Sequence, residues 1–286
     1  MMSTASNTTI ATESRIGWMH LRVTDPLVAW LTYRGVLQSI DCAAPEFMSI
    51  WATKASRASI NLSARSFYER EYRLEIARRI TNPTAVSRLT GLFVFPTRAD
   101  ADRAVAEWDG FEDYFLNEVE IQPGSRVSAY DADWITSAGW SLDADASREY
   151  VSGSPRTTSP HTELLVSGRV NVLGTELRRK ARDVVEAAWP EAVSMLEIAR
   201  LGAELASSIG YIAAYPTLVD DHVHIQYMID MRDADNPSFT DSLGVHIASL
   251  PPEHVNRADL AAGGDKFRVP DLASRTIRIP VADWPW

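Results

Sequence analysis

The chain has 286 residues, of which 45% are hydrophobic and 23% charged, so it can bury a substantial core. Its formal charge of −10 argues against broad, non-specific nucleic-acid binding, which depends on a basic surface, although a local basic groove remains compatible with it. The single cysteine, Cys42, excludes an intramolecular disulfide and a cysteine-rich zinc site, and no apolar run approaches the roughly 20 residues of a membrane span. The N-terminus also lacks a signal core, so the sequence predicts a cytoplasmic protein without membrane contacts, built as one large domain or two closely packed ones.

The first part of the chain predicts a tail, a strand and helices. Residues 1–14 are rich in Ser, Thr and Asn and predict a flexible tail. Alternation over residues 17–25 predicts the first strand. Residues 26–63 indicate helical pieces, most clearly at 45–56, and the charged segment 64–80 predicts an amphipathic helix.

The middle of the chain alternates between short strands and helices. Thr97 is well placed to cap a helix that runs to about Trp108. The predicted strands are 89–96, 113–121 and 126–131, followed by a short helix at 131–139 and an exposed loop at 152–160. Residues 161–166 and 169–174 predict a hairpin-like pair of strands.

From residue 174 the sequence changes character. Residues 175–210 predict two helices broken at Trp189-Pro190, with Thr175 as N-cap and Gly210 as stop. The predicted strands that follow are 211–218, 222–231, 243–250 and 275–281. Because strands and helices mix without a regular βαβ alternation, the sequence favours an α+β class over a doubly wound sheet.

Several familiar catalytic motifs are absent from the sequence. It has no phosphate-binding P-loop, no GxGxxG after a strand, no GxSxG elbow and no HExxH, which disfavours glycine-loop nucleotide enzymes and α/β hydrolases. His222 and His224 fall on one face of a predicted strand and could ligate a metal, but a third ligand stays open among His246, His254 and several acids. An alternating half-exposed strand explains the two histidines equally well, and we expect no metal.

Three separated segments share an order that is known from one family. They are HLRVT, SRLTGLFVF and TELLV, which carry His20, Arg22 and Thr24, then Arg88 and Thr90, then Glu163. This order resembles the ADP-ribosyltransferase fold, and the segments around residues 92–108 and 114–135 are similar to those of small bacterial mono-ADP-ribosyltransferases. The resemblance covers residues 15–173 and implies a split mixed or antiparallel sheet with helices, followed by a C-terminal α+β extension over 174–286 that packs on the core.

The resemblance implies a site that uses NAD as a substrate. Glu163 would stabilise the positive charge that develops on the ribose as the nicotinamide bond breaks, and would bind the ribose hydroxyls. Arg22 would hold a phosphate or ribose of NAD, with His20 and Thr24 beside it on the same strand, and Arg88 would reach the pyrophosphate. Thr90 would hold the strand ends at the cleft, and Tyr68 or Phe67 would stack on the nicotinamide. Without such a site, Glu163 is a strand-edge residue and Arg22 an exposed cation paired with Asp25 or another acid.

One departure from the family pattern bears on the acceptor. Members that modify arginine place a glutamate or glutamine two residues before the catalytic glutamate, where this chain has His161. The acceptor is therefore left open between a protein side chain, a nucleic acid and a small molecule. Glu118 and Glu120 have the two-glutamate spacing and are the second choice for the catalytic position, although they would leave the core too short.

The resemblance also bears on biological role. Small bacterial relatives are commonly toxins or effectors of phage defence, which implies an antiviral or toxin role for this chain. Residues 174–286 have no counterpart in the resemblance, and they could complete the sheet, form the acceptor-binding face or dock an antitoxin-like protein partner. Two alternatives share the same fold: an NAD glycohydrolase, in which water is the acceptor, and a binding module that has lost catalysis.

Overall fold

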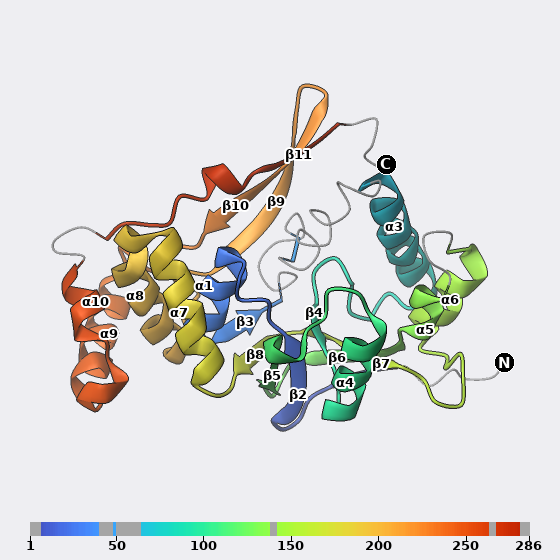
Figure 1. Cartoon of the computed structure of the whole chain (residues 1–286), viewed down its shortest axis with the longest axis horizontal. Coiled ribbons are helices and arrows are strands. Elements are labelled where there is room, and N and C mark those ends of the chain that lie inside the picture. The colour runs from blue at the N-terminus through green and yellow to red at the C-terminus, as the bar shows by residue number, and fades with distance from the viewer. Residues whose placement is uncertain (1–6, 40–47, 50–63, 138–141, 263–266, 281–286) are drawn as a thin grey trace.

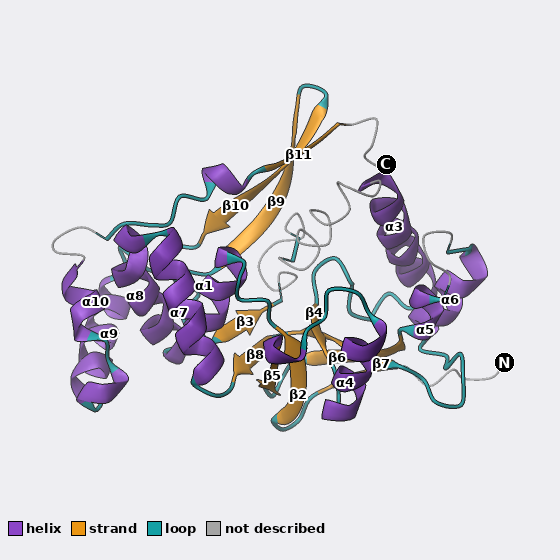
Figure 2. Ribbon diagram, in the orientation of Figure 1, coloured by secondary structure: helices purple, strands orange, loops and turns teal. Residues whose placement is uncertain are grey.

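The computed structural model describes residues 7–39, 48–49, 64–137, 142–262 and 267–280, with residues 64–69 described for their backbone. The protein is a mixed α+β molecule in which every paired strand of the described part runs antiparallel to its neighbours (Figure 1 and Figure 2). The expected α+β class is confirmed. No helix among the described residues combines the length and apolar character needed to cross a membrane.

The strands form three sheets. The first has the order β1-β6-β7-β4, the second β2-β5-β8-β3 and the third β11-β10-β9. Their bounds are β1 (Thr8–Ile10), β2 (Arg15–His20), β3 (Val36–Gln38), β4 (Leu92–Val94), β5 (Leu116–Ile121), β6 (Arg126–Asp131), β7 (Thr162–Ser167), β8 (Arg169–Val172), β9 (Ile212–Val219), β10 (His222–Ile229) and β11 (Ile277–Pro280).

Most helices gather in two groups on either side of the four-stranded sheets, whereas α4 lies with the sheets between them (Figure 2). The α-helices are α1 (Pro26–Arg34), α3 (Ala64–Thr81), α4 (Arg98–Glu107), α5 (Asp133–Thr136), α6 (Ala144–Ser152), α7 (Glu176–Ala188), α8 (Val193–Glu204), α9 (Pro237–Ser249) and α10 (Arg257–Ala262). Short 3₁₀ turns lie at η2 (Asp113–Phe115), η3 (Pro190–Ala192), η4 (Pro252–His254) and η5 (Ala273–Arg275). In Figure 1, α1, α7 and α8 lie together on one side, whereas α3, α5 and α6 lie on the other.

The two four-stranded sheets meet where β2 passes β4. Trp18 and Phe95 exchange backbone hydrogen bonds of 2.9 and 2.8 Å there, which makes an isolated antiparallel bridge. Gly17 permits this approach, since a Cβ at that position would lie 2.5 Å from a methyl carbon of Val94. Consecutive strands are divided between the sheets, so that β5 and β8 lie in one and β6 and β7 in the other.

The main core continues from the sheets into the C-terminal helices. Leu164 and Val166 of β7 belong to the same buried cluster as Leu196 of α8. Trp30 of α1 is fully buried, and its indole N–H donates to the Gly210 carbonyl at 2.7 Å. This places residues of the predicted extension directly against α1, because burial of a large aromatic with a satisfied N–H favours close packing.

Local signals predict many elements correctly. The helix over 64–80, the strands of β5, β6, β9 and β10, and the helix break at Trp189-Pro190 are all confirmed. Thr97 caps α4 as predicted, with its hydroxyl accepting from the Asp100 amide. The predicted helix at 45–56 and Cys42 lie outside the described residues, apart from Met48 and Ser49.

Five predictions of local structure are wrong. The tail predicted over residues 1–14 contains β1, which pairs with β6, and the strand predicted over 17–25 ends at His20. Residues 243–250 belong to α9, where Asn236 caps the helix and Pro237 begins it. The pair β7 and β8 is no hairpin, since the two strands lie in different sheets. The helix before Gly210 already ends at Glu204, whereas Thr175 does occupy the N-cap position of α7, without a side-chain hydrogen bond.

Gly168 makes the change of sheet between β7 and β8. Its φ of +155° is in a region that favours glycine, and a Cβ there would lie 2.2 Å from Ser125 Oγ and 2.8 Å from Ser125 Cα. A larger residue must therefore move backbone as well as side chain.

We predict that Gly168→Ala lowers the free energy of unfolding by about 1–3 kcal/mol, because it combines backbone strain with a clash. The matched control is Gly244→Ala in α9, where a Cβ would meet open space and the helix should gain up to about 1 kcal/mol. Urea unfolding of the two variants measures both changes. Equal midpoints for Gly168→Ala and the parent protein would contradict the role given to Gly168.

Candidate functional site

Glu163 is the second residue of β7, the strand that lies between β6 and β4. Side chains alternate along the strand, so Glu163 and Leu165 face α3 and α6, whereas Leu164 and Val166 enter the main core. Tyr130 of β6 is its cross-strand partner. The carboxylate therefore faces the buried cluster that contains Leu74 of α3 and Tyr150 of α6, and the residue is only 5% exposed.

Arg88 and Tyr150 hold the Glu163 carboxylate. Oε1 of Glu163 accepts hydrogen bonds from Arg88 Nη1 and from the Tyr150 hydroxyl, each at 2.6 Å. The same Nη1 donates to the Tyr150 oxygen at 2.7 Å, which closes a triangle of polar contacts. Among the described residues, Glu163 Oε2 has no hydrogen-bond partner, so one carboxylate oxygen is committed to the protein and the other is not.

Glu71 of α3 completes the network around Arg88. Arg88 Nε donates to Glu71 Oε2 at 2.9 Å, and Arg70 Nη2 donates to Glu71 Oε1 at 3.1 Å. The Arg88 guanidinium carbon also lies 4.8 Å from the centroid of the Phe93 ring and 5.4 Å from that of Tyr150. One guanidinium thus serves two carboxylates and two aromatic faces, an arrangement that suits its planar shape.

The charges of this network alter proton affinities. Burial opposes the charged form of Glu71, but the neighbouring Arg88 and Arg70 overcome it and hold the pKa of Glu71 below its ordinary value of 4.5. Burial, with the Glu163 charge next to it, raises the pKa of the Tyr150 hydroxyl well above 10.0. Tyr150 therefore acts as a neutral hydrogen-bond donor to Glu163 at physiological pH.

A cavity of about 240 Å³ opens beside this network. Its walls are largely aromatic and its floor is charged; the lining residues that matter here are Phe93, Phe95, Trp108 and Phe111 on the walls and His20, Arg70, Glu71, Arg88 and Glu163 around the polar part. Such a pocket, with few polar groups converging in an apolar surround, is typical of small-molecule sites. Its volume suits one ring system with a sugar.

The structure brings together three of the residues that the sequence proposes for the site. His20, Arg88 and Glu163 all line the cavity, and they come from β2, from the turn before β4 and from β7. His20 Nε2 accepts from the Glu112 amide at 3.1 Å, and its ring packs on Phe111 with centroids 4.4 Å apart. The histidine therefore forms a fixed part of the wall.

Other proposed residues lie elsewhere. Arg22 follows the end of β2 and lines a neighbouring hollow of about 50 Å³ that shares His20 with the main cavity. Its side chain is 43% exposed and lies 3.8 Å from Glu112, as the alternative reading of an exposed paired cation anticipates. Thr24 is exposed and lines neither hollow. Thr90 precedes β4 in a turn and is not part of the strand, and the side chain of Tyr68 lies outside the described residues.

Glu71, Tyr150 and Trp108 are site residues that the sequence does not single out. Glu71 lies among alternating charges of α3, where a buried acid reads like its solvated neighbours. Tyr150 lies in α6, in a stretch to which the sequence analysis assigns no element. No spacing rule links either residue to Glu163, because the link is made only by tertiary packing.

The alternative catalytic pair and the alternative metal pair are both placed away from the cavity. Glu118 and Glu120 belong to β5 of the other sheet, where Glu118 is exposed and Glu120 accepts from Gln122 and Asn171. His222 and His224 have ring centroids 6.5 Å apart on β10, and in the described part of the chain they join no third ligand.

No family model and no curated protein matches the chain. The chemistry that the site can perform is therefore inferred from its geometry alone. A carboxylate with one fixed oxygen, beside an aromatic cavity, can stabilise a developing cation or orient hydroxyl groups.

We predict that Glu71→Gln lowers the free energy of unfolding by about 3–5 kcal/mol near neutral pH, because it leaves Arg88 short of one buried counter-charge. The pKa of Glu71 is depressed in the folded protein, so its stabilising effect is complete above 4.5 and is lost as the pH falls through the folded pKa. The difference between variant and parent should therefore shrink on acidification. Urea unfolding from about pH 7 to about pH 3 measures this.

Glu118→Gln is the matched control, since that carboxylate is exposed on β5. It should cost little at any pH. A difference between Glu71→Gln and the parent that stays constant with pH would show that the Glu71 charge is not what the network uses.

Proposed function

We propose that the protein is a mono-ADP-ribosyltransferase that transfers ADP-ribose from NAD, with Glu163 as its catalytic residue. The observation that carries this proposal is the position of Glu163 on the cavity wall, with Oε1 held by Arg88 and Tyr150 and Oε2 uncommitted among the described residues. The cavity lining and the order of the segments that supply it support the same reading.

The residue types fit the cleavage of a nicotinamide–ribose bond. As that bond breaks, the electron pair leaves with nicotinamide and positive charge develops on the ribose carbon, where a nearby carboxylate lowers the barrier. Two hydrogen bonds to Oε1 fix the carboxylate, so that it need not reorganise during the reaction. The aromatic wall of Phe95, Trp108 and Phe111 offers faces on which a nicotinamide ring would stack.

The strand arrangement supports the proposed fold family. Two four-stranded antiparallel sheets meet at the Trp18–Phe95 bridge, and the cavity lies beside this junction, with Phe95 in its wall. A split sheet with the catalytic glutamate at a strand start is what the resemblance implies. We therefore include the ADP-ribosyltransferase fold itself in the proposal.

A dinucleotide would extend past His20 toward Arg22. The main cavity of about 240 Å³ is slightly below the roughly 300–1,000 Å³ usual for ligand sites, so it suits one half of NAD. The second hollow shares His20 and carries Arg22, whose exposed guanidinium can bind a phosphate. In this arrangement Arg22 acts away from Glu163.

The acceptor depends on what lies near Glu163. His161, at the position where arginine-modifying relatives carry an acid, is completely buried and packs against Trp108 with ring centroids 4.6 Å apart. It offers no carboxylate to activate an arginine acceptor. This favours another macromolecular acceptor, protein or nucleic acid, and makes water the second candidate, which would give an NAD glycohydrolase. A toxin or phage-defence role, with an antitoxin-like partner, rests on the resemblance alone.

The test uses NAD labelled on the adenylate, incubated with the full chain alone, with cell lysate and with total nucleic acid. We predict that the parent protein consumes NAD and that Glu163→Gln reduces the rate by at least about 10²–10³-fold, the effect of removing a group that stabilises charge in a transition state. Glu118→Gln is the control and should keep full activity, since Glu118 lies on the other sheet.

The destination of the label separates the candidates. Label on a macromolecule that protease or nuclease releases identifies a transferase and its acceptor class, whereas free ADP-ribose identifies the glycohydrolase. Equal NAD consumption by Glu163→Gln and the parent would refute the catalytic role of Glu163. Intact NAD in every mixture would favour the binding module.

A further inference from the structure

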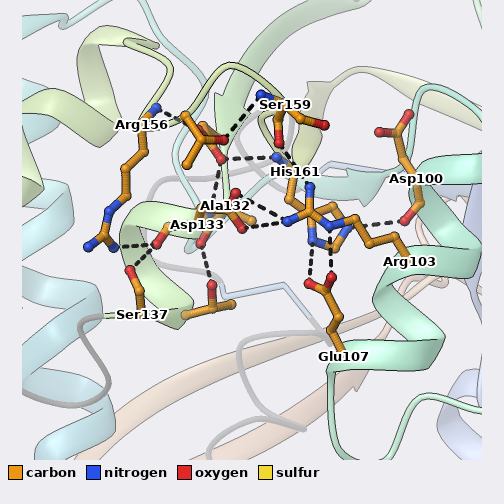
Figure 3. A network of polar contacts seen from close by, with 12 residues as sticks. Asp100, Arg103, Glu107, Ala132, Asp133, Ser137, Arg156, Ser159 and His161 are labelled. Atoms are coloured by element: carbon orange, nitrogen blue, oxygen red, sulfur yellow. Dashed lines mark hydrogen bonds and ion pairs between the residues drawn. The ribbon is translucent and has the colours of Figure 1, made fainter.

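A second group of ionisable side chains lies behind the cavity wall. Glu107 at the end of α4, Asp133 at the start of α5 and His161 just before β7 offer ligand atoms that all lie within 4.8 Å of one another (Figure 3). Carboxylate oxygens and imidazole nitrogens are both ligand types that divalent transition metals accept. Carboxylates alone do not indicate a metal site, so the hydrogen bonding of the His161 ring is the deciding observation.

The hydrogen bonds of His161 fix its tautomer. Its Nε2 lies 3.1 Å from the Asp100 carbonyl oxygen, and a carbonyl only accepts, so Nε2 carries a proton. In the neutral ring, Nδ1 then presents a lone pair. Nδ1 is buried without a hydrogen-bond partner in the described part of the chain, and it faces Glu107 Oε2 at 3.8 Å. A lone pair opposite a carboxylate calls for a cation between them.

The surroundings of the ring match those of a metal ligand. Histidines that bind metals usually donate their other ring N–H to a carbonyl or carboxylate, as His161 does to Asp100. The ring is completely buried and packs on Trp108, which fixes its orientation. Asp131 Oδ1 accepts from the backbone amides of His161 and Asp133 and so holds two of the three ligand residues in place.

Arg103 supplies the positive charge in the present arrangement. Its Nε donates to Glu107 Oε1 at 2.9 Å, and its Nη2 contacts both oxygens of Asp133 at 3.3 Å (Figure 3). It donates no hydrogen bond to His161 Nδ1. The Arg103 side chain is 33% exposed and can therefore turn toward solvent, leaving its two carboxylates to another cation.

We propose that Glu107, Asp133 and His161 Nδ1 bind a divalent transition-metal ion, for which Zn²⁺ is the probe, in competition with Arg103. Zinc bonds of about 2.0–2.2 Å require the ligand atoms to draw closer than they now stand. The half-exposed side chain of Glu107 provides that movement. Bound metal would clamp α4, α5 and the start of β7 behind Trp108, and this site is independent of the function proposed for Glu163.

The inference revises the expectation that the protein holds no metal, and it is tested by binding. The full chain is dialysed against chelator and then against Zn²⁺, and uptake is measured by equilibrium dialysis. We expect one site whose affinity falls at least about 10-fold in Glu107→Gln, the loss usual for a damaged metal site. Asp102→Asn is the matched control on the same helix, because Asp102 pairs with Arg98 and lies outside the cluster.

Arg103→Ala gives a test with the opposite sign. Removing the competing cation should tighten Zn²⁺ binding by about 2- to 5-fold, the equivalent of one exposed ion pair. Substitution by Co²⁺ adds a spectroscopic readout, since its visible bands report nitrogen and oxygen ligands. No uptake by the parent protein, equal affinity in Glu107→Gln, or weaker binding in Arg103→Ala would overturn the proposal and leave His161 as a buried structural neighbour of Glu107.

Discussion

The Arg88 guanidinium is the interaction on which the candidate site depends. It joins the turn before β4 to Glu71 of α3, Tyr150 of α6 and Glu163 of β7, four segments that are distant in sequence. Glu71 and Glu163 are both buried, and both bind this one guanidinium. Because two buried carboxylates repel each other unless a cation lies between them, Arg88 makes their approach possible. One guanidinium compensates only one of the two negative charges, and Arg70 supplies the second positive charge at Glu71.

The two sheets determine where this network meets the cavity. Close contact of β2 with β4 brings His20 and Phe95 to the cavity, and β7 brings Glu163 to it. The segment that follows α4 then packs Trp108 and Phe111 against Trp18 and Phe95 at the β2–β4 junction. The aromatic wall is therefore a product of the sheet junction, and the polar floor is a product of α3 and α6 packing on β6 and β7.

The sequence predicts the elements better than it predicts the site. Helices α3 and α4 and strands β9 and β10 follow from periodicity and caps, which act within a few residues. The strand predicted over residues 243–250 is wrong because a short apolar run has the same composition in a strand as in a helix such as α9. The helix start at Asn236-Pro237 is the local signal that favours a helix there. Glu163 and Arg88 can be found from segment order, but Glu71 and Tyr150 cannot, since only packing over long sequence separations brings them together.

The most direct test of the account is where NAD binds. Hydrogen–deuterium exchange on the Glu163→Gln protein, with and without saturating NAD, reports the protected segments without turnover. The account predicts protection of the turn and strand from Arg88 to Phe95, of the segment Trp108 to Phe111 and of the start of β7. Protection confined to the C-terminal helices, or no protection at all, would contradict the placement of the site beside Arg88 and Glu163.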